Sequence, residues 1–339
     1  MPPVPEKQNT TARKIYEWYE SQKEDHREHL GASLIGHHCN RYLWLTFRWS
    51  VSPQFEGRVL RLFSTGKREE ERIYNELRAI GVELHTEQDG KQIVCRDDSG
   101  HFGGSLDGIG LGFIEGPKTW AVLEVKTCNA SSFAKLVKAN SVKIAKPQHY
   151  AQMQTYMGMM GLTRALYFAV NKDTDDLYTE WVHADKEAYL DALARAERII
   201  SATTPPSRIS EDPANWQCKM CDMYKLCHQK DPAEVNCRTC AHSTPTDGGK
   251  WICREHDKIL SAADQRKGCD SHIFIPALVA GTAIDAGDHF VEYFVEGTGE
   301  TFKNGPAHTP SREFVKRRKK VPKADPVDNT PFIDDEIPF

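Results

Sequence analysis

TWAVLEVKT, residues 119–127, is the stretch that decides the fold, because its β-branched and aromatic residues predict a strand that carries both an acid and a base. Successive side chains of a strand point to opposite faces, so Glu124 and Lys126 leave one face of the sheet and Val125 leaves the other. Taken alone, such a pair can also be an ordinary ion pair on the surface of a sheet. The segments around it decide between these two interpretations.

Short strands and helices surround this segment. Further strands are expected in VELHT (82–86), KQIVCRD (91–97), GGSLDGIGLGF (103–113), RALYFAVNK (164–172) and LYTEWVHA (177–184). Apolar residues at helical spacing predict helices over residues 10–30, 60–81, 146–161 and 185–202, and Gly81 and Gly161 are expected to end two of them. This mixture, with some antiparallel strands, predicts an α/β fold in which a mixed sheet is flanked by helices.

The composition of the 339 residues excludes several classes of protein. With 39% hydrophobic and 27% charged residues, and with no apolar run near the ~20 residues of a membrane helix, the chain has the make-up of a globular protein. Its net charge of −4 excludes a polycation, so nucleic acid must meet a local basic surface. The first residues lack the apolar part of a secretory signal, so we expect a cytoplasmic protein whose ten cysteines stay reduced.

A third group with suitable chemistry lies upstream of the strand. Asp107 follows two glycines in GGSLDGIG, where a turn or a neighbouring strand brings its carboxylate beside Glu124. Two carboxylates form the oxygen-rich site that Mg²⁺ or Mn²⁺ prefers. A metal there polarises a phosphate and acidifies a water, while Lys126 positions that water or neutralises developing charge. The residues therefore indicate phosphodiester hydrolysis.

These residues belong to a longer ordered pattern that extends over about residues 30–230. Along the chain, the pattern is Gly66 with Glu70, Gly104 with Asp107, Glu124 with Lys126, and Gln152 with Tyr156. The order resembles that of the PD-(D/E)xK nuclease superfamily, specifically its RecB-like branch, which includes AddB-type and CRISPR-associated iron–sulfur nucleases and phage exonucleases. The resemblance implies a restriction-endonuclease-type core and metal-dependent cleavage of DNA.

The resemblance also implies roles for individual residues. Asp107 and Glu124 look like the metal ligands, with the backbone carbonyl of Val125 as a further ligand, and Lys126 looks like the catalytic lysine. Glu70 stands where many relatives have a histidine, although two further glutamates flank it in the sequence. Its carboxylate is expected to approach the metal directly or through a water.

The helix expected over residues 146–161 carries the last pair of the pattern. Gln152 and Tyr156 are four residues apart and share a face, and His149 lies three residues before Gln152 on nearly the same stripe. By resemblance, such a face meets the DNA backbone or a terminal base near the metal. The alternative is a core helix, because four methionines lie nearby.

A first set of cysteines frames the nuclease pattern. Cys218, Cys221 and Cys227 lie within ten residues, and Cys39 is available as a fourth thiolate. Four thiolates suit either tetrahedral zinc or an iron–sulfur cluster, so the ligand type leaves the metal open. One distant cysteine followed by C-x2-C-x5-C is similar to the [4Fe–4S] staple of AddB-type nucleases, which implies a structural cluster. A zinc knuckle, or a three-ligand site with a free Cys39, are the alternatives.

A second set of cysteines follows in a turn-rich, polar segment. Cys237, Cys240, Cys253 and Cys269 provide four more thiols, in a stretch too short to build a large core of its own. Metal binding supplies the folding free energy that such a small core lacks, so we expect structural zinc. Nearby histidines are possible substitutes, but four thiols already suffice.

The end of the chain is strongly biased. Residues 312–323 hold seven basic residues and one acidic residue, and an acidic stretch then ends in PFIDDEIPF. The last six residues are Asp334, Asp335, Glu336, Ile337, Pro338 and Phe339, and they resemble the tip of bacterial single-stranded-DNA-binding proteins. The resemblance implies a partner with a pocket for such tips. An acidic solubilising tail is the alternative, and the basic run either holds nucleic acid or is a solvated linker.

Together these observations predict a metal-dependent DNA nuclease, namely an exonuclease that acts on ends or single strands. By resemblance, its setting is phage or bacterial DNA recombination, replication or repair. The alternative is a catalytically idle DNA-binding adaptor that recruits partners through its tip. The expected division is an N-terminal helix over 1–30, a nuclease domain with its iron–sulfur staple over 31–232, a zinc module over 233–280, a linker over 281–311, and a disordered tail over 312–339.

Overall fold

The computed structural model describes most of the chain, namely residues 9–22, 26–52, 54–229, 231–279, 281–295 and 299–319. The acidic tip at residues 334–339 lies outside these ranges, and so the prediction of a partner for this tip rests on the sequence. Among the described residues, no helix has both the length and the apolar character needed to cross a membrane.

A five-stranded mixed sheet forms the centre of the fold, in the order β10-β9-β8-β7-β2. Its strands are β2 (Glu83–His85), β7 (Gly108–Leu111), β8 (Ala121–Cys128), β9 (Arg164–Asn171) and β10 (Leu177–His183). Strands β8 and β9 pair in parallel, and the other neighbours pair antiparallel. The strand around Glu124 is therefore the central strand of the sheet, which is consistent with its nearly continuous burial.

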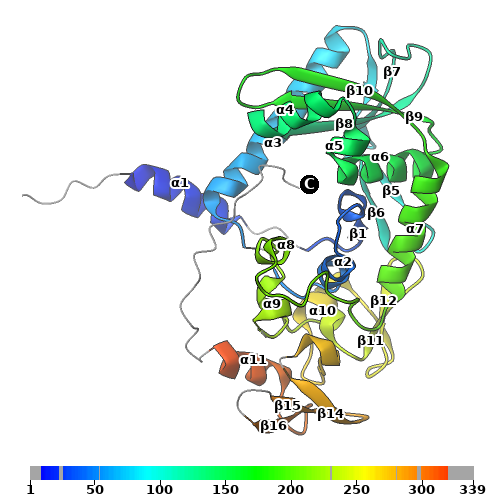
Figure 1. Cartoon of the computed structure of the whole chain (residues 1–339). Helices are drawn as coiled ribbons and strands as arrows, with labels where there is room; N and C mark the ends of the chain where they lie inside the picture. The colour runs from blue at the N-terminus through cyan, green and yellow to red at the C-terminus, as the bar shows by residue number, and fades with distance from the viewer. Residues whose placement is uncertain are drawn as a thin grey trace, which may run out of the picture.

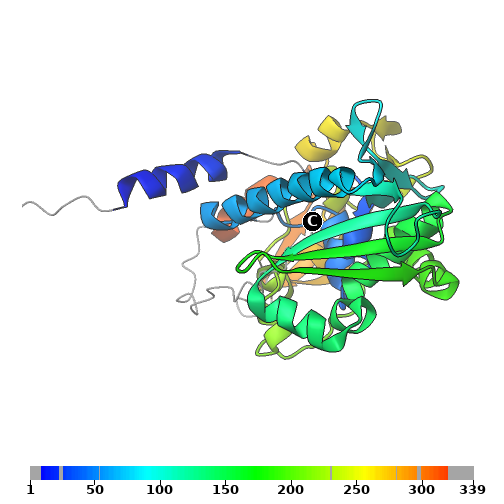
Figure 2. The same ribbon diagram turned by 90° about the horizontal axis from the view of Figure 1, so that it is seen from above.

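Helices cover both faces of this sheet, which confirms the expected mixed α/β core (Figure 2). On one face, α3 (Gly57–Ala79) packs Ile73 and Leu77 against Leu123 and Val125 of β8. On the other face, α6 (Pro147–Met160) packs against the side of β8 that bears Val122. The remaining helices of this layer are α4 (Ala130–Ala139), α5 (Val142–Ala145) and α7 (Lys186–Ser201). The alternation along β8 thus separates two apolar layers.

The segment 103–113 differs from the single strand expected for it. It forms β6 (Phe102–Ser105) and β7 in two different sheets, because the chain leaves the first sheet at Leu106 and Asp107. The first sheet also contains β1 (Leu30–Gly31) and β5 (Val94–Arg96), and a separate hairpin contains β3 (Glu87–Gln88) and β4 (Lys91–Gln92). The break between β6 and β7 is what places an aspartate beside the central strand.

The first helix is shorter than expected. α1 spans Thr10–Ser21 rather than residues 10–30, and it projects beside the start of α3 (Figure 1). Gly57 lies so close to the backbone of Tyr16 that an added Cβ would be 2.3 Å from its carbonyl oxygen, and its N–H donates to Glu20. A glycine at the start of α3 therefore permits this close approach.

The cysteine-bearing part follows α7 and lies below the central sheet in the view of Figure 1. Its elements are α8 (Trp216–Lys219), α9 (Tyr224–His228), the 3-10 helix η2 (Cys237–Thr239), β11 (Ser243–Thr246), β12 (Lys250–Cys253), β13 (Lys258–Leu260), α10 (Ala262–Lys267) and the 3-10 helix η3 (Pro276–Leu278). The N-terminal η1 (Ala32–Leu34) and α2 (Asn40–Phe47) complete the core.

The stretch expected to be a linker and the start of the expected disordered tail both contain regular structure. Three antiparallel strands, β14 (Thr282–Gly287), β15 (Phe290–Val295) and β16 (Glu300–Asn304), form a small sheet, and α11 (Ser311–Lys319) follows it. Every second residue of β15 is buried, beginning with Val291 and Tyr293. This alternation in FVEYFV is the strand pattern that the sequence reading missed.

Candidate active site

The loop before β7 places Asp107 against the central strand. The antiparallel register pairs Gly108 with Leu123, so the residue before Gly108 lies level with Glu124. Asp107 Oδ2 accepts a hydrogen bond of 2.7 Å from the backbone N–H of Val125. This bond fixes one oxygen of the carboxylate and shows that the two segments meet as the spacing predicted.

Glu124 and Lys126 form a buried ion pair on the α6 face of β8. Lys126 Nζ lies 2.6 Å from Glu124 Oε1, and the two side chains are 8% and 0% exposed. The second oxygen of Glu124, Oε2, has no hydrogen-bond partner in the part of the chain that the structure describes. A buried carboxylate oxygen without a partner is costly, so the pair is not an ordinary surface ion pair.

The ionisable groups of this site influence one another strongly. Burial raises the pKa of Glu124 to about 8, against the opposing effect of the Lys126 ammonium. Burial also raises the pKa of Asp107. For Lys126, burial acts to lower the pKa, but the charges of Glu124 and Asp107 outweigh it, and the pKa is raised. The site therefore favours a charged lysine and disfavours a second negative charge beside it.

Helix α3 contributes Glu70, and the structure separates it from its two neighbours. Burial, followed by the charge of Asp107, raises the pKa of Glu70 to about 7. Glu69 instead lies 3.3 Å from Arg72 in an ion pair along the helix, and Glu71 is exposed. The choice of Glu70 among three consecutive glutamates is thus consistent with its position in the site.

The face of α6 that carries Gln152 and Tyr156 is buried beside the ion pair. Gln152 Nε2 lies 3.3 Å from the Tyr156 hydroxyl, and burial, followed by the charge of Glu124, raises the pKa of that hydroxyl well above its usual value. A Cβ at Gly104 would lie 2.5 Å from the Tyr156 hydroxyl. Met153 and Met157 are fully buried on the same helix, so α6 serves the core as well.

His149 contacts a residue that the sequence reading missed. Its Nδ1 lies 2.8 Å from the hydroxyl of Tyr167 on β9. The parallel register pairs Tyr167 with Glu124, so both side chains leave the same face of the sheet. Burial and the charge of Lys126 hold the pKa of His149 well below its usual range, which makes the ring neutral. Only the pairing of β8 with β9, which one sequence does not reveal, identifies Tyr167.

The oxygen donors of this site suit a hard divalent cation. Asp107 and Glu124 offer carboxylate oxygens side by side, and the unpartnered Oε2 of Glu124 is one free coordination position. Across the described ranges, no three or more His, Cys, Asp or Glu side chains are arranged as a ready-made metal site. Mg²⁺ usually keeps several waters and binds one or two carboxylates, so two carboxylates are sufficient.

The first cysteine set gathers around one small cavity. Cys39, at the start of α2, lines it together with Cys218, Cys221 and Cys227, and two histidines that precede Cys39 also lie there. The cavity measures about 30 Å³, which is space for one or two waters. The four thiols suit zinc or iron–sulfur chemistry by ligand type.

The second cysteine set also lines one cavity. Cys237, Cys240, Cys253 and Cys269 surround a volume of about 370 Å³, and three histidines contribute to its wall. His256 Nε2 lies 3.4 Å from Cys269 Sγ. Cys95 and Cys128 are buried elsewhere, and all ten cysteines are free thiols.

Comparisons with known proteins give similarities at low sequence identity. No family model matches the chain, and no curated protein matches it significantly. The crystal structure of an alkaline exonuclease (LHK-Exo) from Laribacter hongkongensis aligns with 54% of this chain and 90% of its own, at 13% identity and a TM-score of 0.39. The structure of LHK-Exo in complex with dAMP aligns with 55% of this chain and 89% of its own, at 15% identity and a TM-score of 0.36. The crystal structure of SSO0001 aligns with 65% of this chain and 97% of its own, at 13% identity and a TM-score of 0.40.

Proposed function

We propose that the chain is a metal-dependent deoxyribonuclease of the PD-(D/E)xK type, RecB-like, that acts as an exonuclease on DNA ends or single strands. The observation that carries this proposal is the buried cluster of Asp107, Glu124 and Lys126, in which one carboxylate oxygen has no partner among the described residues. A purely structural ion pair does not require a second carboxylate, and a buried carboxylate oxygen without a hydrogen-bond partner destabilises it.

Asp107 and Glu124 would hold Mg²⁺ or Mn²⁺, with the Val125 carbonyl as a further ligand. When bound, the ion supplies Lewis-acid polarisation of the phosphodiester and lowers the pKa of water. Lys126 keeps its proton on Nζ, because the carboxylates raise its pKa, and it neutralises charge that develops on the phosphoryl oxygens. Glu70, whose pKa is about 7, is suited to accept a proton near neutral pH.

Gln152, Tyr156 and His149 form the proposed substrate face of α6. The amide of Gln152 and the hydroxyl of Tyr156 contact each other, which orients both polar groups beside the carboxylates. The neutral ring of His149 is held by the Tyr167 hydroxyl. Hydrogen-bond donors at such positions suit the DNA backbone or a terminal base.

The direct test measures degradation of end-labelled single- and double-stranded DNA with Mg²⁺ or Mn²⁺. We expect Lys126→Ala to lose about 10³-fold or more of the rate, the size of effect seen when a group that stabilises transition-state charge is removed. Lys172→Ala is the matched control, because Lys172 lies 2.9 Å from Asp173 in a partly exposed ion pair in the turn after β9. Equal degradation by wild type and Lys126→Ala would contradict the nuclease assignment and favour the DNA-binding adaptor.

The first cysteine set is proposed to bind a structural metal centre. We infer a [4Fe–4S] cluster from the spacing of Cys39, Cys218, Cys221 and Cys227. A single zinc ion bound by the same thiols is the alternative. Anaerobic analysis of iron, sulfide and zinc per chain separates the two, since only the cluster carries sulfide.

The partner and setting are also proposals. We infer that the tip at Asp334 to Phe339 docks on a protein with a pocket for single-stranded-DNA-binding-protein tips, during phage or bacterial recombination, replication or repair. Deleting the last three residues tests this, because it removes the terminal carboxylate and the phenylalanine together. Nuclease activity on free DNA is expected to be unchanged, while binding to such a partner is lost.

A further inference from the structure

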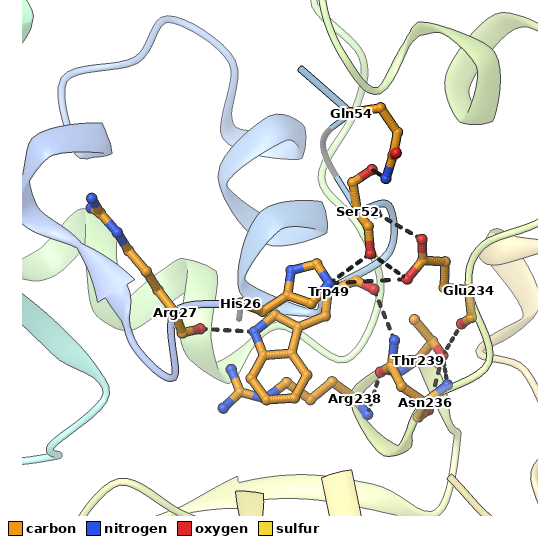
Figure 3. A network of polar contacts seen from close by, with 9 residues as sticks. All are labelled: His26, Arg27, Trp49, Ser52, Gln54, Glu234, Asn236, Arg238 and Thr239. Atoms are coloured by element: carbon orange, nitrogen blue, oxygen red, sulfur yellow. Dashed lines mark hydrogen bonds and ion pairs between the residues drawn. The ribbon is translucent and has the colours of Figure 1, made fainter. Parts of the chain in front are cut away.

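The turn between two cysteines inserts an arginine among aromatic rings that come partly from the N-terminal segment. Arg238 lies between Cys237 and Cys240 and is 1% exposed. Its guanidinium stacks 3.7 Å from the centre of the Trp49 ring (Figure 3). It also donates to the carbonyl of Phe47 at 3.0 Å and to that of Glu28 at 2.9 Å. One side chain of the cysteine segment therefore binds N-terminal backbone about 200 residues away in the sequence.

The same contact stabilises an unusual backbone conformation. Trp49 has a positive φ of 52°, a region that bulky side chains seldom occupy. Asn236, which caps η2, donates from its side chain to the Trp49 carbonyl at 2.8 Å, and Trp49 Nε1 donates to the carbonyl of Arg27 at 2.8 Å (Figure 3). The conformation of Trp49 thus depends on the residues that flank Cys237.

The four thiols of the second set are held on separate elements around one cavity. Cys237 begins η2, Cys253 ends β12, and Cys269 follows α10, so no local sequence alone brings them together. The C-x2-C spacing of Cys237 and Cys240 is typical of one ligand pair of a structural zinc site, and four thiolates are a ligand set that tetrahedral zinc prefers. All four thiols line the same cavity of about 370 Å³.

We propose that Cys237, Cys240, Cys253 and Cys269 bind one Zn²⁺, and that this ion fixes Arg238 in the aromatic pocket of the nuclease core. The role of Arg238 goes beyond stabilisation of the cysteine segment itself, because the ion would also hold that segment against the residues near Trp49. The rigid turn between the first two ligands determines where Arg238 points. His256, close to Cys269 Sγ, is placed to donate a hydrogen bond to a bound thiolate.

Metal analysis of the purified full-length chain tests the site itself. Wild type is expected to bind one zinc per chain at this set, and Co²⁺ substitution is expected to give the intense visible bands of a tetrahedral thiolate site. Cys253→Ser is expected to lose this zinc. Cys218→Ser, which changes the first cysteine set, is expected to keep it. Wild-type protein without zinc, or loss of the zinc in Cys218→Ser but not in Cys253→Ser, would overturn the proposal.

A double-mutant cycle tests the connection through Arg238. Thermal unfolding is measured for Cys253→Ser, for Arg238→Met, and for the two changes together. If the ion acts through Arg238, the combined decrease in Tm is clearly smaller than the sum of the single decreases. Full additivity would refute the connection, even if zinc is present. Neither experiment depends on nuclease activity, so failure here is distinguishable from failure of the proposed function.

Discussion

Two buried charged residues in this molecule differ in how many hydrogen-bond partners the protein gives them. Arg238 is enclosed by rings, and its three guanidinium nitrogens donate to Gln265 and to two backbone carbonyls. Glu124 is equally buried, but it has one ammonium beside it and one oxygen with no partner among the described residues. Each guanidinium nitrogen of Arg238 thus has an acceptor within the protein, whereas one oxygen of Glu124 gains a partner only if a ligand binds. The following predictions test this difference.

The largest effect on stability is expected from Arg238→Met. The change leaves the carbonyl of Phe47 and the side-chain oxygen of Gln265 buried without their donor, so the free energy of unfolding should fall by about 3 kcal/mol. Denaturant unfolding followed by fluorescence measures it. Arg254→Met is the matched control in the same region, because Arg254 is exposed, and its effect should stay within about 0.5 kcal/mol. Equal effects of the two changes would mean that the Arg238 contacts contribute nothing.

A smaller change in stability, of opposite sign, is expected from Glu124→Gln in protein without divalent cations. A carboxyl whose pKa is raised from 4.5 to about 8 stabilises the fold below pH 4.5, and this contribution is lost as the pH rises towards 8. The neutral amide avoids that loss. At pH 8 the variant should therefore be more stable by about 1 kcal/mol, because the lost ion pair with Lys126 offsets part of the gain.

The control for this prediction is the same comparison at pH 5. Glu124 is protonated there, so wild type and variant should unfold at nearly the same denaturant concentration. A variant that is less stable than wild type at pH 8 would show that the ion pair is structural. In that case Glu124 resembles Arg238 and the contrast between the two regions disappears.

The affinity for Mn²⁺ should rise with pH, because the raised pKa values of Glu70 and Glu124, about 7 and about 8, mean that the ion displaces protons. Between pH 6 and pH 8 the Kd should decrease as the pH rises. The decrease is at most about tenfold per pH unit for each proton that the ion displaces. Isothermal titration calorimetry in two buffers of different ionisation enthalpy counts the protons. A Kd independent of pH would contradict this account of the site.

The smallest effect is expected from Tyr167→Phe. The change removes the hydroxyl that lies 2.8 Å from His149 Nδ1 and leaves the ring in place. A single neutral hydrogen bond contributes about 1 kcal/mol. The nuclease rate should therefore fall several-fold, and the free energy of unfolding should fall by about 1 kcal/mol. Tyr178→Phe, on the neighbouring strand β10, is the control for loss of a tyrosine hydroxyl. A rate for Tyr167→Phe that equals the control would remove Tyr167 from the site.

The sequence predicts the central sheet and the meeting of Asp107, Glu124 and Lys126 better than it predicts the contacts between distant segments. Alternation along residues 119–127 is a local property, and it correctly places Glu124 and Lys126 on one face. The periodicity of α3 and α6 is local as well. These patterns require no knowledge of which strands are neighbours.

The remaining features depend on tertiary pairing. Tyr167 looks like one more core residue of a buried strand until the register places it beside Glu124. Arg238 looks like a solvated residue between two cysteines, because nothing in its neighbourhood indicates an aromatic pocket formed by residues near position 49. The strand β15 alternates, but the glycines and polar residues around it made a linker the simpler interpretation.

The Arg238 contacts also bear on the order in which the chain completes its fold during synthesis. The carbonyls of Glu28, Phe47 and Trp49 find their donors only after residues 236–238 have left the ribosome. A fragment that stops near residue 232 therefore contains every residue of the carboxylate cluster and still lacks the donors that close its own N-terminal segment. Truncated versions of the chain that end near residue 232 should need those few downstream residues to be produced in a well-folded state.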